Sequence, residues 1–342
     1  TSVGTKSKGR SPLLLVMDGH AMVYRAWFAL ANTRPFTVRK TGEDVRGVYS
    51  FTTTFFKTFN DLKPTHVAIA FDPPGPTFRH EVYEDYKANR AETPPDLEHQ
   101  VQRVIQFVHT LGVPAISRER YEADDIIGSL SHTLVRQGYD VIIVTGDSDL
   151  LQLVEDGTIA VLPGARRFGE FREYDPAAVI ERFGFEPELI PDYKALVGDT
   201  SDNIPGVPKV GPKTAAKWLN EYGTLDNLIA NADAITGKVG ESLRASLKDL
   251  ELSRKLATLD CDVSLTQDYE SLVQREPNRE RLRELYTRLE LRSHLRQLGE
   301  SEATGSQSSP VPPLTPAAPV SYETITTFES LTQWIERLRN AE

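Results

Sequence analysis

The sequence has a single cysteine, Cys261, so disulfide bonds within the chain and thiolate metal sites are excluded. Its seven histidines are scattered without metal-ligand spacing and form no triad pattern. We interpret them as structural, and expect only His20, beside Asp18, to lie near a functional pocket. No apolar run approaches the roughly 18 residues of a membrane span, so no association with a membrane is expected.

Positive charge is also scarce in this sequence. The 342 residues include 39 Lys and Arg against 49 Asp and Glu, and the net charge of −10 argues against general adhesion to nucleic acid. Any nucleic-acid site must therefore be a local basic face. The composition and length are typical of a soluble protein with two or three domains. The basic residues 1–12 precede no signal-peptide core, which predicts a cytoplasmic protein.

Acidic residues follow several apolar runs of strand length. The runs are continuous rather than alternating, as expected for parallel strands that are covered on both faces. Parallel strands deliver their carboxyl ends to one edge of a sheet, where open α/β sheets place their ligands. The runs with their acids are residues 13–17 with Asp18, residues 67–71 with Asp72, and residues 141–144 with Asp147 and Asp149.

A further acidic group opens a predicted helix over residues 121–137. Glu122, Asp124 and Asp125 stand at its start, where one or two acids are ordinary because the helix dipole favours them. Together with the strand-end acids they predict a shared acidic pocket. Mutual repulsion there must be relieved by raised pKa values or by cations, and hard oxygen ligands suit Mg²⁺ or Mn²⁺.

Residues 73–95 interrupt the α/β alternation directly after Asp72. The segment interleaves basic and aromatic side chains between two proline pairs. A solvated loop with a short helix is the ordinary interpretation of such a segment. Its position favours a basic cover over the acidic pocket, with cations for phosphates and rings for stacking on bases. The side chains concerned are Arg79, Lys87, Arg90, Phe78, Tyr83 and Tyr86.

Residues 192–222 add Asp199 and Asp202 and then a glycine-rich turn that leads into a helix. Backbone N–H groups at such a helix start, followed by Lys213 and Thr214, bind a phosphate without reading a base. An ordinary turn between two helices fits the residues equally well. The remaining expected elements are helices over 47–59, 97–111, 225–230, 242–247, 249–257 and 279–298, a helix or turn over 150–154, a strand over 159–162 and a hairpin over 166–174.

The candidate functional residues fall in seven short motifs, which occur along the chain in this order: LLLVMDGHAMVYR, FD at Phe71 and Asp72, FRHEVYEDYKANR, YEADD, TGDSD, GDTSDN and GVPKVGPKTA. Together they resemble the 5′-nuclease domain of bacterial DNA polymerase I, a relative of the flap endonucleases, over residues 13 to about 298. The resemblance implies an α/β fold with a mostly parallel sheet and helices on both faces, as in PIN and flap nucleases. A helical subdomain with a helix-hairpin-helix would follow.

The resemblance also implies roles for individual residues. Two divalent cations would be held by the nine acids, and Lys87, Arg90 and Arg79 would act on the scissile phosphate. A monovalent cation such as K⁺ is implied at the hairpin. The acids are Asp18, Asp72, Glu122, Asp124, Asp125, Asp147, Asp149, Asp199 and Asp202. The DNA-binding residues would be Tyr83, Tyr86, Gly206, Val207, Lys209, Gly211, Lys213 and Thr214.

The expected activity is hydrolysis of DNA at 5′ flaps, nicks and 5′ ends, with removal of RNA primers in replication and repair. Two other classes remain: a related acidic-pocket ribonuclease and a non-catalytic DNA-binding scaffold. No polymerase motif is present, and we expect a monomer with polymerase domains following in the same chain. The expected layout is a tail over 1–12, a nuclease core over 13–185 with a helical arch at 73–95, a helical subdomain over 186–298 with its hairpin at 203–222, a linker over 299–320, and the start of an exonuclease-like domain over 321–342.

Overall fold

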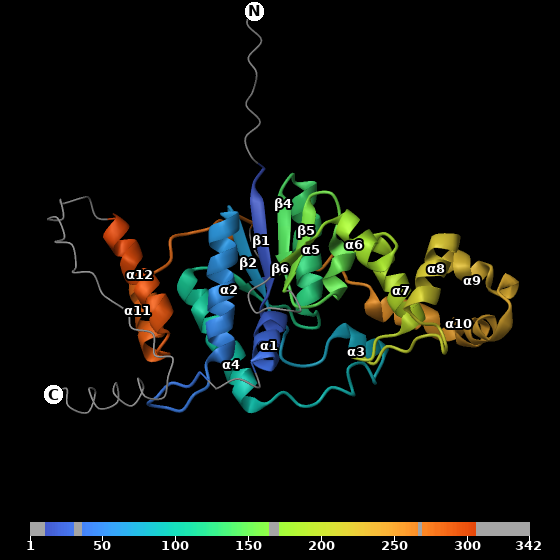
Figure 1. Ribbon diagram of the computed structural model, residues 1–342, viewed down its shortest axis with the longest axis horizontal. Helices are drawn as coiled ribbons and strands as arrows, with labels where there is room; N and C mark the ends of the chain where they lie inside the picture. Colours follow the sequence, from blue (N-terminus) through green and yellow to red (C-terminus); the bar gives the residue numbers. More distant parts are fainter. Residues whose placement is uncertain (1–10, 31–35, 164–170, 266–268, 306–342) are drawn as a thin grey trace, which may run out of the picture. The chain divides into compact units, whose positions relative to one another are not determined.

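A computed structural model describes residues 11–30, 36–163, 171–265 and 269–305 of the chain (Figure 1). The described residues from 11 to 298 form one compact unit, which contains the sheet and the helices around it. The predicted linker beyond residue 305, residues 321–342 and the turn of the predicted hairpin at 166–174 lie outside the described residues. No helix in the described ranges is both long and apolar enough to cross a bilayer.

A six-stranded sheet in the order β3-β2-β1-β4-β5-β6 forms the centre of this unit. The pairings from β3 through β5 are parallel, and β6 joins the edge in the antiparallel direction. The predicted α/β fold with a mostly parallel sheet is thereby confirmed. The strands are β1 (Leu13–Asp18), β2 (His66–Ala70), β3 (Ala115–Ile116), β4 (Asp140–Val144), β5 (Thr158–Pro163) and β6 (Phe171–Tyr174).

Helices cover both faces of the sheet, which explains why the strands read as continuous apolar runs. Alternate side chains of β1 enter different hydrophobic clusters: Leu14 and Val16 enter one, and Leu15 and Met17 the other. On the first face lie α5 (Ala123–Arg136) and the 3-10 helix η1 (Asp149–Leu153). On the second lie α1 (Gly19–Ala29), α2 (Arg46–Leu62) and α4 (Pro95–Leu111).

The helical region after the sheet begins at α6 and is built around the contact between α7 and α10. We predicted two helices, over 242–247 and 249–257, but the structure has one continuous α10, because no glycine or proline separates them. The elements are α6 (Pro176–Phe183), η2 (Pro187–Leu189), α7 (Ile190–Val197), α8 (Pro212–Tyr222), α9 (Leu225–Ala230), η3 (Ala232–Ala234), α10 (Gly237–Ala257) and η4 (Tyr269–Leu272).

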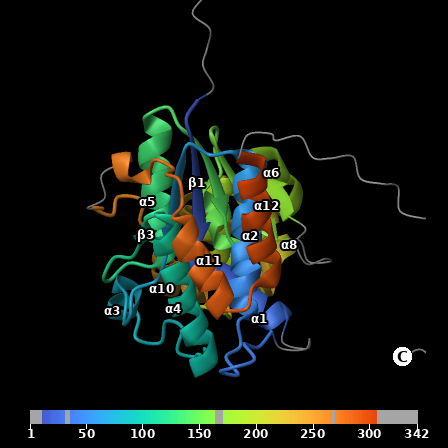
Figure 2. The ribbon, with the colours of Figure 1, turned by 90° about the vertical axis from the view of Figure 1, so that its left-hand side faces the viewer.

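The chain then returns to the α/β region through α11 (Arg279–Arg288) and α12 (Arg292–Gly305). We predicted one solvated helix over 279–298, but it breaks at Glu290, whose φ of 52° is left-handed. Leu282 and Leu285 of α11 are buried in the same cluster as α4 (Figure 2). Residues 279–298 therefore belong with the sheet rather than with the preceding helices.

The predicted arch over 73–95 contains only one short helix, α3 (Phe78–Val82). The rest of the segment runs as turns, and Lys87 adopts a left-handed φ of 58°. Lys87 N–H donates to the carbonyl oxygen of Asp202 at 3.0 Å, and Asn203 Nδ2 donates to the carbonyl of Asp85 at 2.7 Å. These tertiary contacts, rather than helix formation, shape the segment.

Candidate active site

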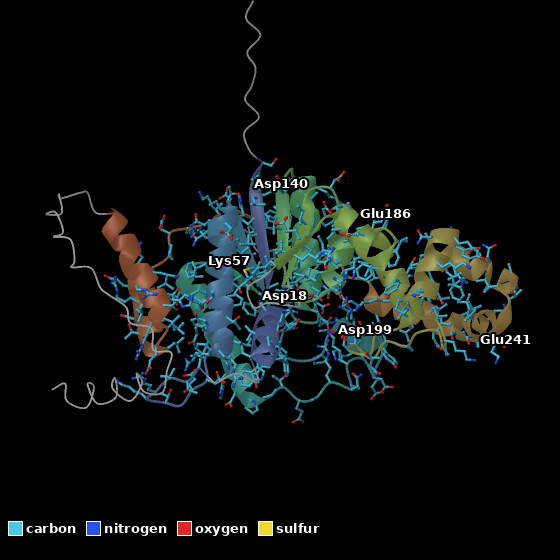
Figure 3. All side chains as sticks on the ribbon, viewed as in Figure 1. Asp18, Lys57, Asp140, Glu186, Asp199 and Glu241 are labelled. Atoms are coloured by element: carbon cyan, nitrogen blue, oxygen red, sulfur yellow. The ribbon has the colours of Figure 1, made fainter. Side chains whose placement is uncertain are left out.

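Two of the predicted acids stand at the carboxyl edge of the adjacent strands β1 and β2. Asp18 ends β1, and its side chain caps α1 by accepting Ala21 N–H at 2.9 Å. Its other oxygen accepts the Thr145 hydroxyl at 3.0 Å, from the segment between β4 and Asp147. Asp72 follows β2 and accepts Ala123 N–H of α5 at 2.8 Å. The strand ends and the start of α5 thus lie together, and Figure 3 labels Asp18 where β1 meets α1.

Burial and mutual repulsion raise the pKa values of two of these acids. Burial, with Asp72 and Asp147 nearby, raises the pKa of Asp18 to about 7. Burial and the charges of Asp18, Asp147 and Asp72 also raise the pKa of Asp124 well above its usual value. The pKa of a carboxyl group rises when burial or neighbouring negative charges make its ionised form unfavourable. These acids therefore hold more negative charge than the surrounding basic groups neutralise. We call Asp18, Asp72, Asp124 and Asp147 the acidic cluster.

Two further acids are paired with cations of the arch segment. Lys87 Nζ lies 2.7 Å from Glu122 and 3.9 Å from Asp202. Arg90 forms an ion pair with Asp202 at 2.5 Å. Burial would lower the pKa of Lys87, but Glu122 and Asp202 outweigh it and raise the pKa above its usual value. The arch cations therefore face the edge of the predicted pocket.

Tyr86 does not fit the stacking role that we predicted for it. The residue is 2% exposed, and its hydroxyl oxygen lies 3.1 Å from Glu122 and 2.9 Å from Asp202, so its one proton is donated to one or the other carboxylate. Burial and these carboxylates raise the pKa of Tyr86 far above its usual value. A ring held in this way cannot receive a base. Tyr83 is half-buried against a small apolar cluster of Tyr86, Ile204, Leu256 and Ala257, and its proposed contact with DNA stays a prediction.

Lys194 is the site residue that sequence reasoning missed. It extends from α7 and forms ion pairs with both Asp149 and Asp199. Burial would raise the pKa of Asp199, but Lys194 and the Ser201 hydrogen bonds lower it to about 2. Asp149 instead has a pKa raised to about 7 by burial and by Asp147, despite Lys194. The short separation of Lys194 from Asp199 was a usable signal, whereas its contact with Asp149 is set only by the fold.

Asp125 and Arg79 form a structural pair, contrary to our expectation of a metal ligand and a catalytic arginine. Arg79 is 1% exposed and Asp125 is fully buried. The guanidinium donates twice to Asp125, at 2.7 and 2.8 Å, and also donates to the carbonyl oxygens of Leu256 and Thr258 at 2.9 Å. The carboxylate also accepts backbone N–H groups, so it is occupied on both oxygens. The pair joins α3, α5 and the end of α10.

The hairpin between α7 and α8 presents only some of its predicted contact residues. Lys209 and Lys213 are exposed, and a Cβ at Gly211 would meet nothing within 4 Å. Gly206 instead lies against the Val197 backbone, where a Cβ would approach within 2.4 Å. Val207 is likewise unsuited to DNA contact. Its side chain is 3% exposed, and its N–H donates to Leu196 at 2.8 Å.

The acidic cluster fits hard divalent cations by its chemistry, because it offers oxygen donors under mutual repulsion. Across the described residues, no three acidic, histidine or cysteine side chains already surround one point as a complete ligand set. Asp149, Asp199, Glu122 and Asp202 are turned to basic partners instead. Any cation that recruits these acids must displace a lysine or arginine.

Comparison with known proteins identifies the family of this chain. Residues 13–184 match the family described as 5′-3′ exonuclease, N-terminal resolvase-like domain, and residues 185–280 match 5′-3′ exonuclease, C-terminal SAM fold. DNA polymerase I of Mycobacterium bovis is 40% identical over 293 residues, which are 85% of this chain and 32% of that protein. Thermostable DNA polymerase I of Thermus thermophilus is 40% identical over 309 residues, 90% of this chain and 35% of that protein. The chain spans about a third of the length of these relatives.

Solved structures of bacteriophage T5 nucleases have a similar fold. The T5 5′-exonuclease with bound divalent metal ions (zinc) has a TM-score of 0.58 and 24% identity, covering 72% of this chain and 90% of that one. A T5 flap endonuclease complex with DNA and metal ions has a TM-score of 0.59 and 23% identity, covering 73% and 89%. At these identities the likeness concerns the fold. Since the two family matches together extend over residues 13–280, the resemblance seen in the sequence is confirmed, and the chain belongs to the 5′-3′ exonuclease family.

Proposed function

We propose that this chain is the 5′-nuclease part of a DNA polymerase I and hydrolyses DNA phosphodiesters at 5′ flaps and 5′ ends. The observation that carries the proposal is the acidic cluster, in which burial and the neighbouring carboxylates raise the pKa values of Asp18 and Asp124. Such a donor set suits two Mg²⁺ or Mn²⁺ ions. When bound, the cations would activate a water and stabilise the leaving 3′ oxygen. The T5 structures, one with zinc and one with metal ions, support metal cations as a class of cofactor.

Lys87 and Arg90 are proposed to bind the scissile phosphate. Both are cationic groups at the edge of the pocket, and their present partners, Glu122 and Asp202, are carboxylates. A phosphate offers the same anionic oxygens, so it can replace a carboxylate on either side chain. Negative charge grows on the phosphate during the reaction, and preorganised cations therefore act most strongly in the transition state.

The hairpin is proposed to hold the duplex next to the cleavage site. Lys209 and Lys213 offer charge to backbone phosphates, and the open surface at Gly211 lets a backbone approach closely. The proposal includes a monovalent cation such as K⁺ here. The expected substrates are 5′-flap DNA, nicked duplex and an RNA primer on DNA. Polymerase domains in the same polypeptide, a monomeric state and a place in replication and repair complete the proposal.

Cleavage mapping of a labelled 5′-flap DNA tests this function. With Mg²⁺, the chain should cut close to the junction of single and double strand, and EDTA should abolish the product. Asp124→Asn should remove cleavage while DNA binding is retained or tightened, because one negative charge facing the phosphate is lost. A single-stranded RNA of equal length is the comparison substrate. Preference for that RNA would instead indicate an acidic-pocket ribonuclease.

The arch is tested separately under single-turnover conditions with saturating enzyme. Lys87→Ala should slow cleavage by roughly 10²-fold, with a much smaller loss of duplex affinity, because the contact strengthens in the transition state. Lys213→Ala is the matched control: it should weaken DNA binding and lower the salt dependence by about one phosphate contact, with an unchanged bound-state rate. Equal rates for Lys87→Ala and the wild type would contradict the role of the arch.

A further inference from the structure

His20 lies on the first turn of α1, the helix that begins where β1 ends (Figure 1). Its imidazole packs edge-on against the ring of Phe71, with the ring centroids 5.8 Å apart, and at a tilt against the ring of Tyr24, at 5.9 Å. About a quarter of the side chain stays exposed. The imidazole therefore lies beside the end of β2, although His20 belongs to α1.

Gly19 makes this close approach of α1 to β2 possible. A Cβ at this position would come within 2.3 Å of the Phe71 ring. Phe71 is buried, and its backbone N–H donates to the carbonyl oxygen of Ile116 in β3 at 2.8 Å, which fixes it at the edge of the sheet. Only a residue without a side chain lets the first turn of α1 pack here, and this packing brings His20 to the residue after Phe71.

The Nδ1 atom of His20 accepts a hydrogen bond from the backbone N–H of Asp72 at 3.1 Å. A backbone N–H can only donate, so Nδ1 carries no hydrogen and the neutral imidazole has its hydrogen on Nε2. The Asp72 carboxylate lies 3.7 Å from the same nitrogen, which is beyond hydrogen-bond distance. His20 therefore holds the main chain of Asp72 rather than its side chain.

Asp72 stands where the chain leaves the sheet. Two prolines follow it, and a proline restricts the residue before it to an extended backbone and has no N–H of its own. The carboxylate of Asp72 reaches α5, where it accepts the N–H of Ala123 at 2.8 Å. Asp72 is thus held twice, with its main chain bound to α1 through His20 and its side chain bound to α5.

We propose that His20 is a positioning residue of the cation site. Asp18 caps α1 with its own carboxylate, and His20 on the first turn of the same helix fixes the main chain of Asp72. The helix thereby sets the separation of two carboxylates that repel each other and that serve the same cations. His20 acts through Asp72 and does not itself bind a cation. The inference rests on the proposed function, because it gives His20 a part in that site.

Two substitutions separate the hydrogen bond of His20 from the packing of its ring. His20→Asn removes the ring but keeps an acceptor, because the Oδ1 atom of asparagine is attached at the same place as Nδ1. His20→Phe keeps a ring against Phe71 and Tyr24 but has no acceptor for the Asp72 N–H. A residue that only packs tolerates phenylalanine better, whereas a residue that positions Asp72 tolerates asparagine better.

Mn²⁺ binding, followed by electron paramagnetic resonance without DNA and well below the melting temperature of each variant, measures the difference. His20→Phe should weaken Mn²⁺ binding roughly tenfold, as for other residues that orient a metal ligand. His20→Gln, a second variant without an acceptor at this position, should do the same. His20→Asn should stay within about threefold of the wild type, because it keeps the hydrogen bond. His66→Phe is the matched control at the opposite end of β2, where Nδ1 pairs with the Thr65 hydroxyl at 2.9 Å, and it should bind Mn²⁺ as the wild type does.

Wild-type Mn²⁺ affinity in both His20→Phe and His20→Gln, or a loss in His20→Asn as large as in His20→Phe, would overturn the positioning role. DNA affinity in EDTA should be equal for His20→Phe and the wild type. A lower affinity there would show that His20 contacts DNA directly and would also refute the assignment. Asp124→Asn distinguishes this failure from that of the proposed function. If Asp124→Asn weakens Mn²⁺ binding and His20→Phe does not, only the role of His20 fails, whereas unchanged binding in Asp124→Asn would remove the cation site and this inference with it.

Discussion

Asp125→Asn and Asp124→Asn provide a sharp comparison, because neighbouring acids on the first turn of α5 have opposite surroundings. Asp125 is fully buried and pairs with Arg79, whereas Asp124 belongs to the acidic cluster. The same isosteric change at each position removes one carboxylate. We expect Asp125→Asn to destabilise the fold without a specific loss of cation binding, and Asp124→Asn to do the reverse.

The magnitude for Asp125→Asn comes from its contacts. The carboxylate accepts two hydrogen bonds from Arg79 and one each from the N–H groups of Glu122 and Asp260, between 2.7 and 3.0 Å. Breaking a buried ion pair by removing one partner costs about 3–5 kcal/mol. Glu122 stays 3.4 Å from Arg79, and the guanidinium keeps its backbone carbonyls, so we expect the lower end, about 3 kcal/mol. For a domain of this size that corresponds to a fall in melting temperature of roughly 6–12 °C.

Asp124→Asn should change stability in the opposite direction in EDTA. Its pKa is raised by burial and by Asp18, Asp147 and Asp72, so its ionised form is unfavourable in the folded protein. Removing that charge should raise the melting temperature of the metal-free protein. The same change should weaken the binding of Mn²⁺, since one hard oxygen donor is lost.

Thermal unfolding in EDTA, together with Mn²⁺ binding followed by electron paramagnetic resonance well below the melting temperature, distinguishes the two acids. Arg79→Met combined with Asp125→Leu gives a further check. Removing both charges of a buried pair is often close to neutral, so the double variant should recover most of the stability lost in Asp125→Asn. Wild-type stability in Asp125→Asn, together with weakened Mn²⁺ binding, would refute the assignment of Asp125 as a structural residue.

Other contacts lead to further predictions. Lys194→Met should lower the melting temperature in EDTA. It should also tighten Mn²⁺ binding roughly tenfold, or about 1.4 kcal/mol, because the ammonium group no longer pairs with Asp199. An unchanged Mn²⁺ affinity would exclude competition between Lys194 and the cation. Burial lowers the pKa of His294 to about 4, whereas its usual value in an unfolded chain is about 6.5. The neutral side chain therefore contributes about 3 kcal/mol to folding stability above pH 6.5, and this contribution is lost as the pH falls to 4. In denaturant titrations from pH 7.5 to 4, the difference in stability between the wild type and His294→Gln should show this slope, because Asp18 and Asp149, which titrate in the same range with the opposite sign, are common to both. Gly206→Ala should lower the free energy of unfolding by about 2 kcal/mol, because the added Cβ would meet backbone atoms. Gly211→Ala should change it by less than about 0.5 kcal/mol, because nothing lies near that position. Similar losses for the two variants would contradict the close packing at Gly206.

The acids at strand ends were predictable because local sequence determines them. A continuous apolar run predicts a parallel strand, and the next acid must then lie at the carboxyl edge of the sheet, as Asp18 and Asp72 do. The start of α5 was also predictable from the sequence, since an acid-rich first turn followed by one apolar face indicates a helix. The outline of the fold and the position of its site are therefore encoded locally.

The partners of those acids were not predictable in the same way. Arg79 lies 46 residues from Asp125, and only the tertiary fold brings them together. Basic and aromatic residues that are interleaved in one segment suggest solvent or substrate contacts, and the family resemblance then implied a catalytic role for Arg79. The buried Tyr86 was misread for the same reason. Burial is a property of the whole packing, and the periodicity of a short segment cannot supply it.

The distribution of partners suggests how substrate and cations depend on each other. Glu122 and Asp202 neutralise Lys87 and Arg90 in this structure, so the acids and the arch cations occupy one another. A phosphate that binds Lys87 releases a carboxylate, and a cation that binds this carboxylate releases Lys87 for the phosphate. Linkage requires the coupling to be equal in both directions. The DNA affinity of the cleavage-deficient Asp124→Asn variant should therefore rise when a divalent cation is added. Adding Lys87→Ala to that variant should reduce this gain in affinity. An undiminished gain would show that the arch cations and the carboxylates act independently.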